Sequence, residues 1–283
     1  MTTTHWQTAR FRIDLSRPRV MGIVNVTPDS FSDGGRYAER SAALAHCETL
    51  LKQGADILDI GGESTRPGSA TPTLEQELDR VLPVVRHAVT LGVPVSVDTS
   101  RPEVMQAALD AGADIVNDVR ALQRRGAVEV LARHPSAGAC LMHMQGEPGT
   151  MQTAPQYDDV VAEVGHFLVD RAQALRDAGI AADRITLDPG VGFGKTPDHN
   201  LQLLQRQREL LAHGYPLLVG WSRKSTLGAV TGRAVGERLV ASVVAALAAV
   251  ERGAAIVRVH DVAETVDALK VWRAATAGRA DAA

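Results

Sequence analysis

Polar side chains recur in this sequence where short apolar segments end. Asp98, Asn117 and Asp188 each close such a segment, and Lys224 lies just beyond another. Ionised carboxylates only accept hydrogen bonds, an amide donates and accepts, and a lysine only donates. Brought together, the four side chains suit a flat heterocycle that presents adjacent N–H donors and a carbonyl oxygen. A single aspartate in such a place would as readily cap the next helix, so the interpretation depends on their convergence.

A second set of residues is suited to an anion. Arg258 and His260 close the last apolar segment, and Asn25 closes the first. Arginine offers phosphate a planar fork of donors, and the amide oxygen of Asn25 is a ligand for Mg²⁺, a hard cation that shares phosphate oxygens. The set predicts a phosphate site with magnesium, although His260 alone would more simply be a capping or surface histidine.

The elements that position these residues repeat a short apolar strand and an amphipathic helix. We expect strands at residues 20–25, 55–61, 93–98, 113–117, 138–143, 184–188, 216–220 and 255–259. Near-continuous apolar strands linked by helices indicate parallel strands that are buried on both faces. Eight units favour an α/β fold of the (β/α)₈ TIM barrel type over an open doubly wound sheet. Such a barrel gathers the carboxyl ends of its strands at one mouth.

Local signals predict where the helices begin and end. Ser100 followed by Glu103, with Pro102 between them, predicts a capping box, and Thr196 before Pro197 predicts an N-cap. Six glycines close helical patterns just before a strand, as glycines at helix C-termini do. They are Gly54, Gly92, Gly112, Gly179, Gly214 and Gly253.

Length and composition fit one enzyme-sized domain over residues 1–283, of which 45% are hydrophobic and 22% charged. An α/β barrel typically needs about 250 residues. Residues 1–19 are expected to form a short hairpin or cap over the barrel bottom, and residues 274–283 a frayed tail. The two cysteines, Cys47 and Cys140, are expected to pack as small buried hydrophobic residues.

The charge pattern argues against polyanionic partners. A formal net charge of -3 gives no overall basic field for nucleic acid or an anionic membrane. The first residues lack the apolar core of a secretory signal, and the longest apolar stretch, residues 239–250, is shorter than the ~20 residues that span a bilayer. We therefore expect a cytoplasmic protein.

The same apolar stretch predicts a homodimer. Residues 239–250 contain no charge and only Ser242 as a polar side chain, so both faces of this helix are apolar. An outer barrel helix should expose one face to water. A second copy of the chain would cover that face, and the alternative is the chain's own tail.

Three glycine-containing segments are candidate loops over the barrel mouth. Residues 188–196 suggest a phosphate-binding loop, but Pro189 occupies the place of the first required glycine, so we interpret the segment as one that lets Phe193 approach a ligand. Residues 27–37 and 61–71 are interpreted as mobile lids.

Eight motifs together resemble those of the dihydropteroate synthases, in the same order from about Val20 to Trp272. They are residues 21–35 (MGIVNVTPDSFSDGG), 59–68 (DIGGESTRPG), 96–99 (SVDT), 117–118 (ND), 142–146 (MHMQG), 188–195 (DPGVGFGK), 222–225 (SRKS) and 258–261 (RVHD). The resemblance implies a (β/α)₈ transferase of folate biosynthesis. It would join 6-hydroxymethyl-7,8-dihydropterin diphosphate to 4-aminobenzoate, release pyrophosphate and be a target of sulfonamides.

The resemblance also implies three groups of site residues. The pterin pocket would contain Asp98, Asn117, Met142, Asp188, Phe193, Lys224 and Arg258. The pyrophosphate site would contain Asn25, Arg258 and His260, with Asn25 as the Mg²⁺ ligand. The aminobenzoate site would contain Phe31, Thr65, Arg66, Pro67 and Ser225. One departure is Trp221, where the family pattern suggests a smaller or more flexible apolar residue.

The expected mechanism is electrostatic and positional, since no Ser-His-Asp or Cys-His set is evident. Pyrophosphate would leave first, and the aromatic amine would then attack a resonance-stabilised pterin cation. The residues expected to act in catalysis are Asp33, Arg66, Asp98, Asp188, Lys224 and Arg258. Two alternatives are a pterin-dependent methyltransferase barrel, which would not need the anion set, and a non-catalytic pterin-binding paralogue.

Overall fold

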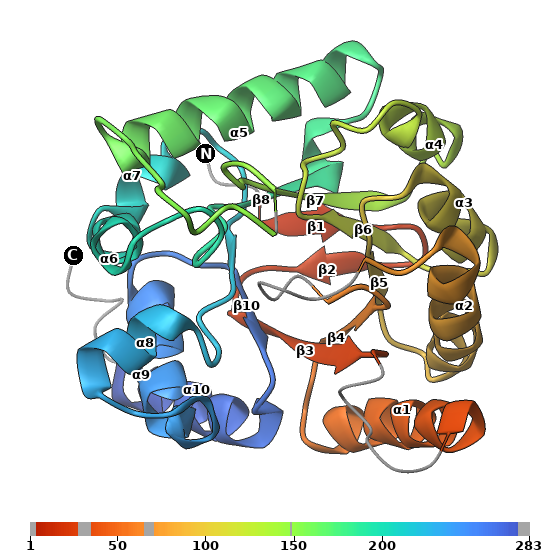
Figure 1. Ribbon diagram of the computed structural model, residues 1–283, viewed down its shortest axis with the longest axis horizontal. Helices are drawn as coiled ribbons and strands as arrows, with labels where there is room; N and C mark the ends of the chain where they lie inside the picture. Colours follow the sequence, from red (N-terminus) through yellow and green to blue (C-terminus); the bar gives the residue numbers. More distant parts are fainter. Residues whose placement is uncertain (1–3, 28–34, 65–70, 148, 277–283) are drawn as a thin grey trace.

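The computed structural model describes residues 4–27, 35–64, 71–147 and 149–276, and its centre is a ring of eight parallel strands (Figure 1). The strands are β3 (Arg19–Asn25), β4 (Ile57–Gly61), β5 (Val95–Asp98), β6 (Ile115–Asp118), β7 (Gly138–Met142), β8 (Ile185–Asp188), β9 (Leu218–Val219) and β10 (Ile256–Val259). Their order is β8-β7-β6-β5-β4-β3-β10-β9. A parallel bridge between Leu187 and Leu217 joins the two ends of this sheet. The predicted (β/α)₈ barrel is confirmed.

Helices surround the ring and cover the outer face of the strands (Figure 1). They are α1 (Gly35–Lys52), α2 (Leu74–Thr90), α3 (Pro102–Asp110), α4 (Ala127–Arg133), α5 (Val160–Asp177), α6 (Pro197–Gln205), α7 (Gln207–Leu211), α8 (Ser225–Thr231), α9 (Leu239–Glu251) and α10 (Val262–Thr276). Short 3₁₀ turns occur at Ala182–Arg184 and Val235–Glu237. The main core lies between the strands and these helices, where residues such as Val24, Leu58 and Val85 are fully buried.

Most of the predicted helix boundaries are confirmed. All six glycines expected at helix ends have positive φ, which only glycine adopts readily. Thr196 caps α6 and accepts a hydrogen bond from the His199 backbone N–H at 3.1 Å. The capping box at Ser100 is wrong. Arg101 is the N-cap of α3, because a residue before proline favours extended backbone, and the Ser100 hydroxyl instead contacts Asp118 at 2.5 Å.

A hairpin of β1 (His5–Gln7) and β2 (Arg12–Asp14) lies at the amino-terminal ends of the barrel strands. Trp6 and Ile13 are buried there in a second core, among strand residues that face the barrel interior: Met21, Ile57, Ile115, Cys140, Leu218 and Ile256. The Trp6 indole N–H donates to the Arg184 carbonyl oxygen at 3.0 Å. The hairpin therefore fills the bottom of the barrel with apolar side chains and leaves the other end for polar residues.

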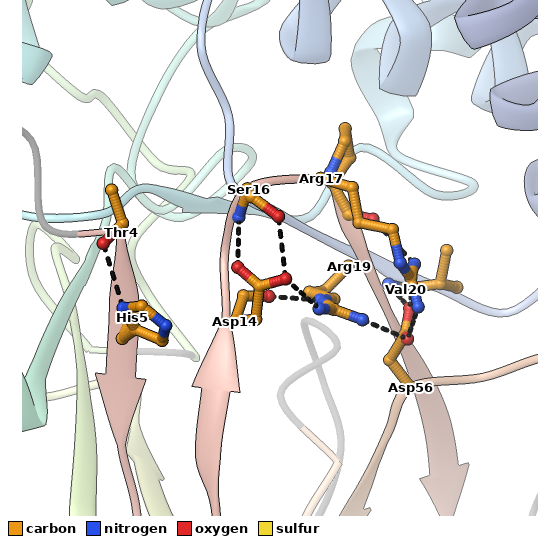
Figure 2. Close-up of polar contacts among 9 residues, drawn as sticks. Thr4, His5, Asp14, Ser16, Arg17, Arg19, Val20 and Asp56 are labelled. Atoms are coloured by element: carbon orange, nitrogen blue, oxygen red, sulfur yellow. Dashed lines mark hydrogen bonds and ion pairs between the residues drawn. The ribbon is translucent and has the colours of Figure 1, made fainter.

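Ion pairs and hydrogen bonds connect the hairpin to the first barrel strands (Figure 2). Asp56, which precedes β4, accepts hydrogen bonds from Arg17 Nη2 at 2.5 Å, Arg19 Nη1 at 3.1 Å and the Val20 backbone N–H at 2.9 Å. Asp14, at the end of β2, accepts from Arg19 as well. One carboxylate thus joins the hairpin exit to both β3 and β4.

Three further sequence expectations concern membrane spans, the cysteines and the C-terminal tail. No helix among them is long and apolar enough to cross a membrane. Cys47 and Cys140 are both free and buried, as expected, and burial raises the pKa of the Cys47 thiol to about 12. The tail expected to fray begins inside α10, and residues 277–283 lie outside the described part of the chain.

Trp6→Ala should lower the free energy of unfolding by about 3–5 kcal/mol, because it removes a fully buried side chain that fills the barrel bottom. Urea denaturation at constant protein concentration measures the change. Phe11→Ala is the matched control, since Phe11 only packs against the edge of this cluster, and it should cost much less. Equal losses of unfolding free energy in the two variants would contradict the assignment of Trp6 as the main side chain that fills the barrel bottom.

Candidate active site

The carboxyl ends of the barrel strands surround a cavity of about 690 Å³. Ten of the residues predicted from the sequence line it, and each lies at a strand end or in the segment that follows. They are Asn25, Asp98, Asn117, Met142, Asp188, Phe193, Lys224, Ser225, Arg258 and His260. Residues from β3, β5, β6, β7, β8 and β10 are therefore brought together as the barrel prediction requires.

The other five predicted site residues, Phe31, Asp33, Thr65, Arg66 and Pro67, lie outside the described residues. Their roles stay predictions. The described residues beside them do reach the cavity, since Thr27, Glu63 and Ser64 line it. The described residues that precede residues 28–34 and 65–70 therefore lie at this cavity.

Arg258 lies at the centre of the charged part of the site. Its Nε donates to Asp59 Oδ2 at 2.6 Å, and its Nη2 donates to Asp98 Oδ2 at 2.6 Å. The Asn117 amide also donates to Asp59 Oδ2, at 3.2 Å. One buried carboxylate thus fixes the guanidinium and an amide that lines the cavity.

Asp59 was given no role in the site by the sequence analysis. It is fully buried and lies in the middle of β4 between Leu58 and Ile60. The sequence did contain a signal for Asp59, namely a carboxylate inside an otherwise apolar strand. An ionised group in such a place must have a charged or hydrogen-bonding partner.

Burial controls the protonation of Asp98 and Asp188, two of the carboxylates that line the cavity. It raises the pKa of Asp98 to about 7, against the opposing effect of the Arg258 guanidinium and with a further rise from Asp59. Burial also raises the pKa of Asp188 to about 6, and the hydrogen bond from the Gly190 backbone N–H, 2.8 Å long, opposes that rise. Both groups are therefore held in the range where a ligand can favour the ionised form.

Lys224 places a cation next to these carboxylates. Burial, and after it the positive charge of Arg258, lower its pKa to about 8. Its Nζ lies 4.1 Å from the centroid of the Phe193 ring, which is a cation–π contact. An aromatic face and an ammonium group are thus presented together on one wall of the cavity.

The glycine-rich segment after β8 is shaped by close contacts within the protein. A Cβ at Gly190 would collide with the His143 carbonyl group, and one at Gly192 would lie 3.1 Å from the Lys224 side chain. Lys195 is buried and donates to Gly190 O and Phe193 O, both at 3.0 Å, and contacts His143 Nδ1 at 2.8 Å. Sequence reasoning gave Lys195 and His143 no role, and here they hold the loop that carries Phe193.

The anion set is also assembled, and its histidine is neutral. Arg258, His260 and Asn25 all line the cavity. Burial, and after it the positive charge of the nearby Arg258, lower the pKa of His260 to about 3. A neutral imidazole cannot attract phosphate by charge, so His260 can only contribute a directional hydrogen bond.

The donor set around Asn25 is compatible with magnesium that arrives with a phosphorylated ligand. No group of three or more His, Cys, Asp or Glu residues suited to a metal occurs among residues 4–27, 35–64, 71–147 and 149–276. Mg²⁺ usually keeps several waters and takes few protein ligands together with phosphate oxygens. The single amide oxygen of Asn25 at the cavity wall fits that pattern of coordination.

Trp221, the residue that departs from the expected pattern, is buried in the main core. It precedes Ser222, whose side chain lines the cavity, so its bulk packs behind this wall. Lys224 and Ser225 also line the cavity. The large side chain therefore leaves the residues of this motif in place.

Comparisons with known proteins agree on one family. Residues 21–260 match the model of the family described as pterin binding enzyme. The chain is 57% identical over 275 residues to a dihydropteroate synthase of Neisseria meningitidis serogroup B, covering 95% of this chain and 96% of the relative. It is 50% identical over 263 residues to that of Escherichia coli K12, covering 93% of each.

Solved structures give the same result. The dihydropteroate synthase of Xanthomonas albilineans with 4-aminobenzoic acid superposes with a TM-score of 0.92 at 51% identity, over 98% of this chain and 99% of that one. The Burkholderia cenocepacia enzyme complexed with 7,8-dihydropteroate has a TM-score of 0.89 at 50% identity, over 99% of both chains.

Asp59→Asn should lower the free energy of unfolding by about 3 kcal/mol, because it leaves a buried guanidinium with one fewer carboxylate. Asp98→Asn is the matched comparison and should cost less, since burial already disfavours its ionised form in the free protein. Guanidinium denaturation of the two variants and the parent measures the difference. A larger loss for Asp98→Asn would contradict the central role of Asp59.

Proposed function

The chain belongs to the pterin-binding enzymes, and among them to the dihydropteroate synthases, and from this premise we propose how its residues perform the reaction of that family. The reaction joins 6-hydroxymethyl-7,8-dihydropterin diphosphate to 4-aminobenzoate and releases pyrophosphate, a step of folate biosynthesis. One observation carries the residue assignment. The residues suited to a heterocycle and the residues suited to an anion line the same cavity: Asp98, Asn117, Asp188 and Lys224 in the first group, and Asn25, Arg258 and His260 in the second.

The pterin ring is bound by complementary hydrogen bonds. Asp98 and Asp188 accept from ring N–H groups, and Lys224 donates to the ring carbonyl oxygen. The Asn117 amide N–H₂ is engaged by Asp59, so its oxygen is directed to accept from the ligand. Phe193 and Met142 line the apolar part of the same cavity, and the guanidinium plane of Arg258 stacks on the ring.

The diphosphate is bound at the other side of Arg258. Arg258 and His260, which line the cavity, donate to its oxygens, and Asn25 would hold the accompanying Mg²⁺. Magnesium, when bound, neutralises part of the charge on the leaving pyrophosphate. The chain's own contribution is the donor geometry, which is set before the substrate arrives because Arg258 is already fixed by Asp59.

The order of bond changes follows from this distribution of charge. The bond between the pterin methylene carbon and the diphosphate oxygen breaks first, and its electron pair leaves with pyrophosphate. The 4-aminobenzoate nitrogen then bonds to the methylene carbon and loses a proton to solvent. Asp98 and Asp188 favour the cation between these steps by electrostatics, and we assign the same role to Asp33.

The second substrate binds beside Ser225. We assign the rest of its site to Phe31, Thr65, Arg66 and Pro67 on the two loops, with Arg66 next to the substrate carboxylate. The solved Xanthomonas albilineans relative holds 4-aminobenzoic acid, and a Yersinia pestis relative holds a sulfonamide drug. We propose that sulfonamides compete for this site here too, in an enzyme of the cytoplasm.

A homodimer through α9 completes the proposal. One face of this helix, including Ala245, Ala246 and Ala249, is buried against the barrel, but Val240 and Val244 are 74% and 59% exposed. α10 packs against α9 and still leaves these valines uncovered. A second copy of the chain would remove them from water.

Sedimentation velocity at micromolar concentration should therefore give twice the 30.1 kDa chain mass. Val240→Glu with Val244→Glu should shift the distribution toward monomer, because the two like charges cannot pair with each other and burying unpaired charges in an interface is costly. Lys270→Glu, on an exposed part of α10, is the control for a surface charge change. A parent protein that sediments as a monomer rules out the dimer.

Asp98→Asn should weaken binding of the pterin substrate about tenfold or more, because the amide presents donors toward ligand donors and leaves a buried polar group unpaired, at ~1–3 kcal/mol. Calorimetric titration with 6-hydroxymethyl-7,8-dihydropterin measures the affinity. Unchanged affinity in a folded variant would reduce Asp98 to a structural partner of Arg258.

The same titration at several pH values tests the ionised state. Asp98 with a raised pKa of about 7 is an acceptor above that pH and becomes protonated below it, so affinity should fall as the pH drops through about 7. In Asp98→Asn the fall in affinity near pH 7 should be absent, and only the fall near pH 6 that is caused by protonation of Asp188 should remain. A pH-independent affinity in the parent protein would contradict the assignment.

Asn25→Ala should reduce turnover by about two orders of magnitude, since a contact that strengthens as the leaving group gains charge contributes ~3 kcal/mol. Pyrophosphate release that depends on both substrates is the assay, and it tests the function itself. Arg258→Ala should be at least as impaired, but it also leaves Asp59 unpaired, so it is the less specific test. Full magnesium-dependent activity of Asn25→Ala would exclude its proposed role.

A further inference from the structure

We propose that Ser222 is a positioning residue, which holds the neutral ring of His260 with its proton on Nε2 so that the ring donates a hydrogen bond to the leaving pyrophosphate. The pyrophosphate part rests on the proposed function. The assignment of the ring tautomer rests on the geometry of the two residues alone.

Ser222 and His260 follow neighbouring strands of the barrel. β9 and β10 pair in parallel, Ser222 comes three residues after the end of β9, and His260 directly follows β10. The Ser222 hydroxyl oxygen lies 2.9 Å from His260 Nδ1 and 3.1 Å from the His260 backbone nitrogen. The side chains of both residues line the cavity, and Ser222 is otherwise buried.

The number of available protons decides which group donates. The His260 backbone N–H can only donate, so the Ser222 oxygen accepts there. The hydroxyl has one proton, and among the described residues Nδ1 is its one acceptor within hydrogen-bonding distance. The alternative, in which Nδ1 also donates to this oxygen, leaves the hydroxyl proton of a buried serine without a partner among the described residues. The contacts therefore make Nδ1 an acceptor.

The surroundings of His260 keep the ring neutral, so only one ring nitrogen carries a proton. Burial lowers its pKa to about 3, and the cations Arg258, Arg223 and Lys224 all act in the same direction. Asp261 opposes them, but its carboxylate is already paired with Arg223 at 2.5 Å. With Nδ1 as acceptor, the proton lies on Nε2, the nitrogen that is free to donate to an anion.

The opposite tautomer would harm the reaction. A proton on Nδ1 leaves a lone pair on Nε2, and this lone pair would repel the oxygens of a leaving pyrophosphate. Ser222 thus acts on the chemistry through His260 without contacting the substrate. Because it selects a ring tautomer, its loss has a spectroscopic signature that loss of a merely structural contact would not produce.

Nitrogen-15 spectra of histidine-labelled protein test the tautomer directly. The His260 signals are identified by their loss in His260→Gln. We expect the parent protein and Ser222→Thr, which keeps the hydroxyl, to show a proton on Nε2, and Ser222→Ala to show a mixture or a proton on Nδ1. Ser96→Ala is the matched control, because Ser96 is a fully buried barrel serine whose hydroxyl makes no hydrogen bond to a described residue. A proton on Nδ1 in the parent, or unchanged Nε2 protonation in Ser222→Ala, overturns the proposal.

Inhibition by inorganic pyrophosphate tests the functional consequence. The inhibition constant should rise about five- to tenfold in Ser222→Ala and return to within twofold of the parent in Ser222→Thr, the size expected for one lost hydrogen bond to a charged group. Equal inhibition of the parent and Ser222→Ala rejects the role in pyrophosphate release. If the parent releases no pyrophosphate from the two substrates, the proposed function fails, while the spectra still decide the tautomer.

Discussion

A buried guanidinium at the mouth of the barrel constrains the rest of the site. An unpaired charge in a protein interior is strongly unfavourable, so Arg258 on β10 requires carboxylates within reach. Asp59 on β4 and Asp98 on β5 supply them at 2.6 Å each. Closing the barrel brings these three strands together, which means that the fold and the charge pairing stabilise the same arrangement.

The two carboxylates paired with Arg258 differ in their surroundings, and this difference favours catalysis. Asp59 is fully buried and also binds the Asn117 amide, whereas Asp98 faces the cavity and has a pKa raised by burial. The free enzyme therefore keeps an acceptor at the cavity wall that its surroundings only partly satisfy. A ligand with N–H donors, and still more a cation formed from it, gains from this acceptor. Electrostatic catalysis requires this kind of preorganised charge.

The sequence predicted the repeated strand and helix units and most of the residues that line the cavity. The barrel and its eight strands were predicted from the repeated apolar segments, and seven of the fifteen site residues from the polar residues that follow them. Phe193 was predicted from the glycine-rich segment, and Met142 and Ser225 from the family resemblance. These ten residues line the cavity, and the expected family is confirmed. The remaining five lie outside the described residues. Lys195 was missed because two of its partners are backbone carbonyl groups of its own loop, which no side-chain pattern reveals. Asp59 and Ser222 were missed because their partners are protein groups on distant segments, which spacing along the chain does not reveal. Ser100 was wrongly assigned for the same reason, since its hydroxyl is used by Asp118 on β6.

The glycine-rich segment shows how a familiar pattern can serve a different physical purpose. In a phosphate-binding loop the lysine reaches the ligand, but here Lys195 is buried and donates to backbone carbonyls of its own loop. Burial lowers its pKa to about 7, so the ammonium group is only partly charged near neutral pH. The glycines are required by the approach of this loop to His143 and Lys224. Phosphate binding must then come from other strands, and Arg258 at the end of β10 is a cavity cation whose pairing with carboxylates raises its pKa and keeps it charged at any physiological pH.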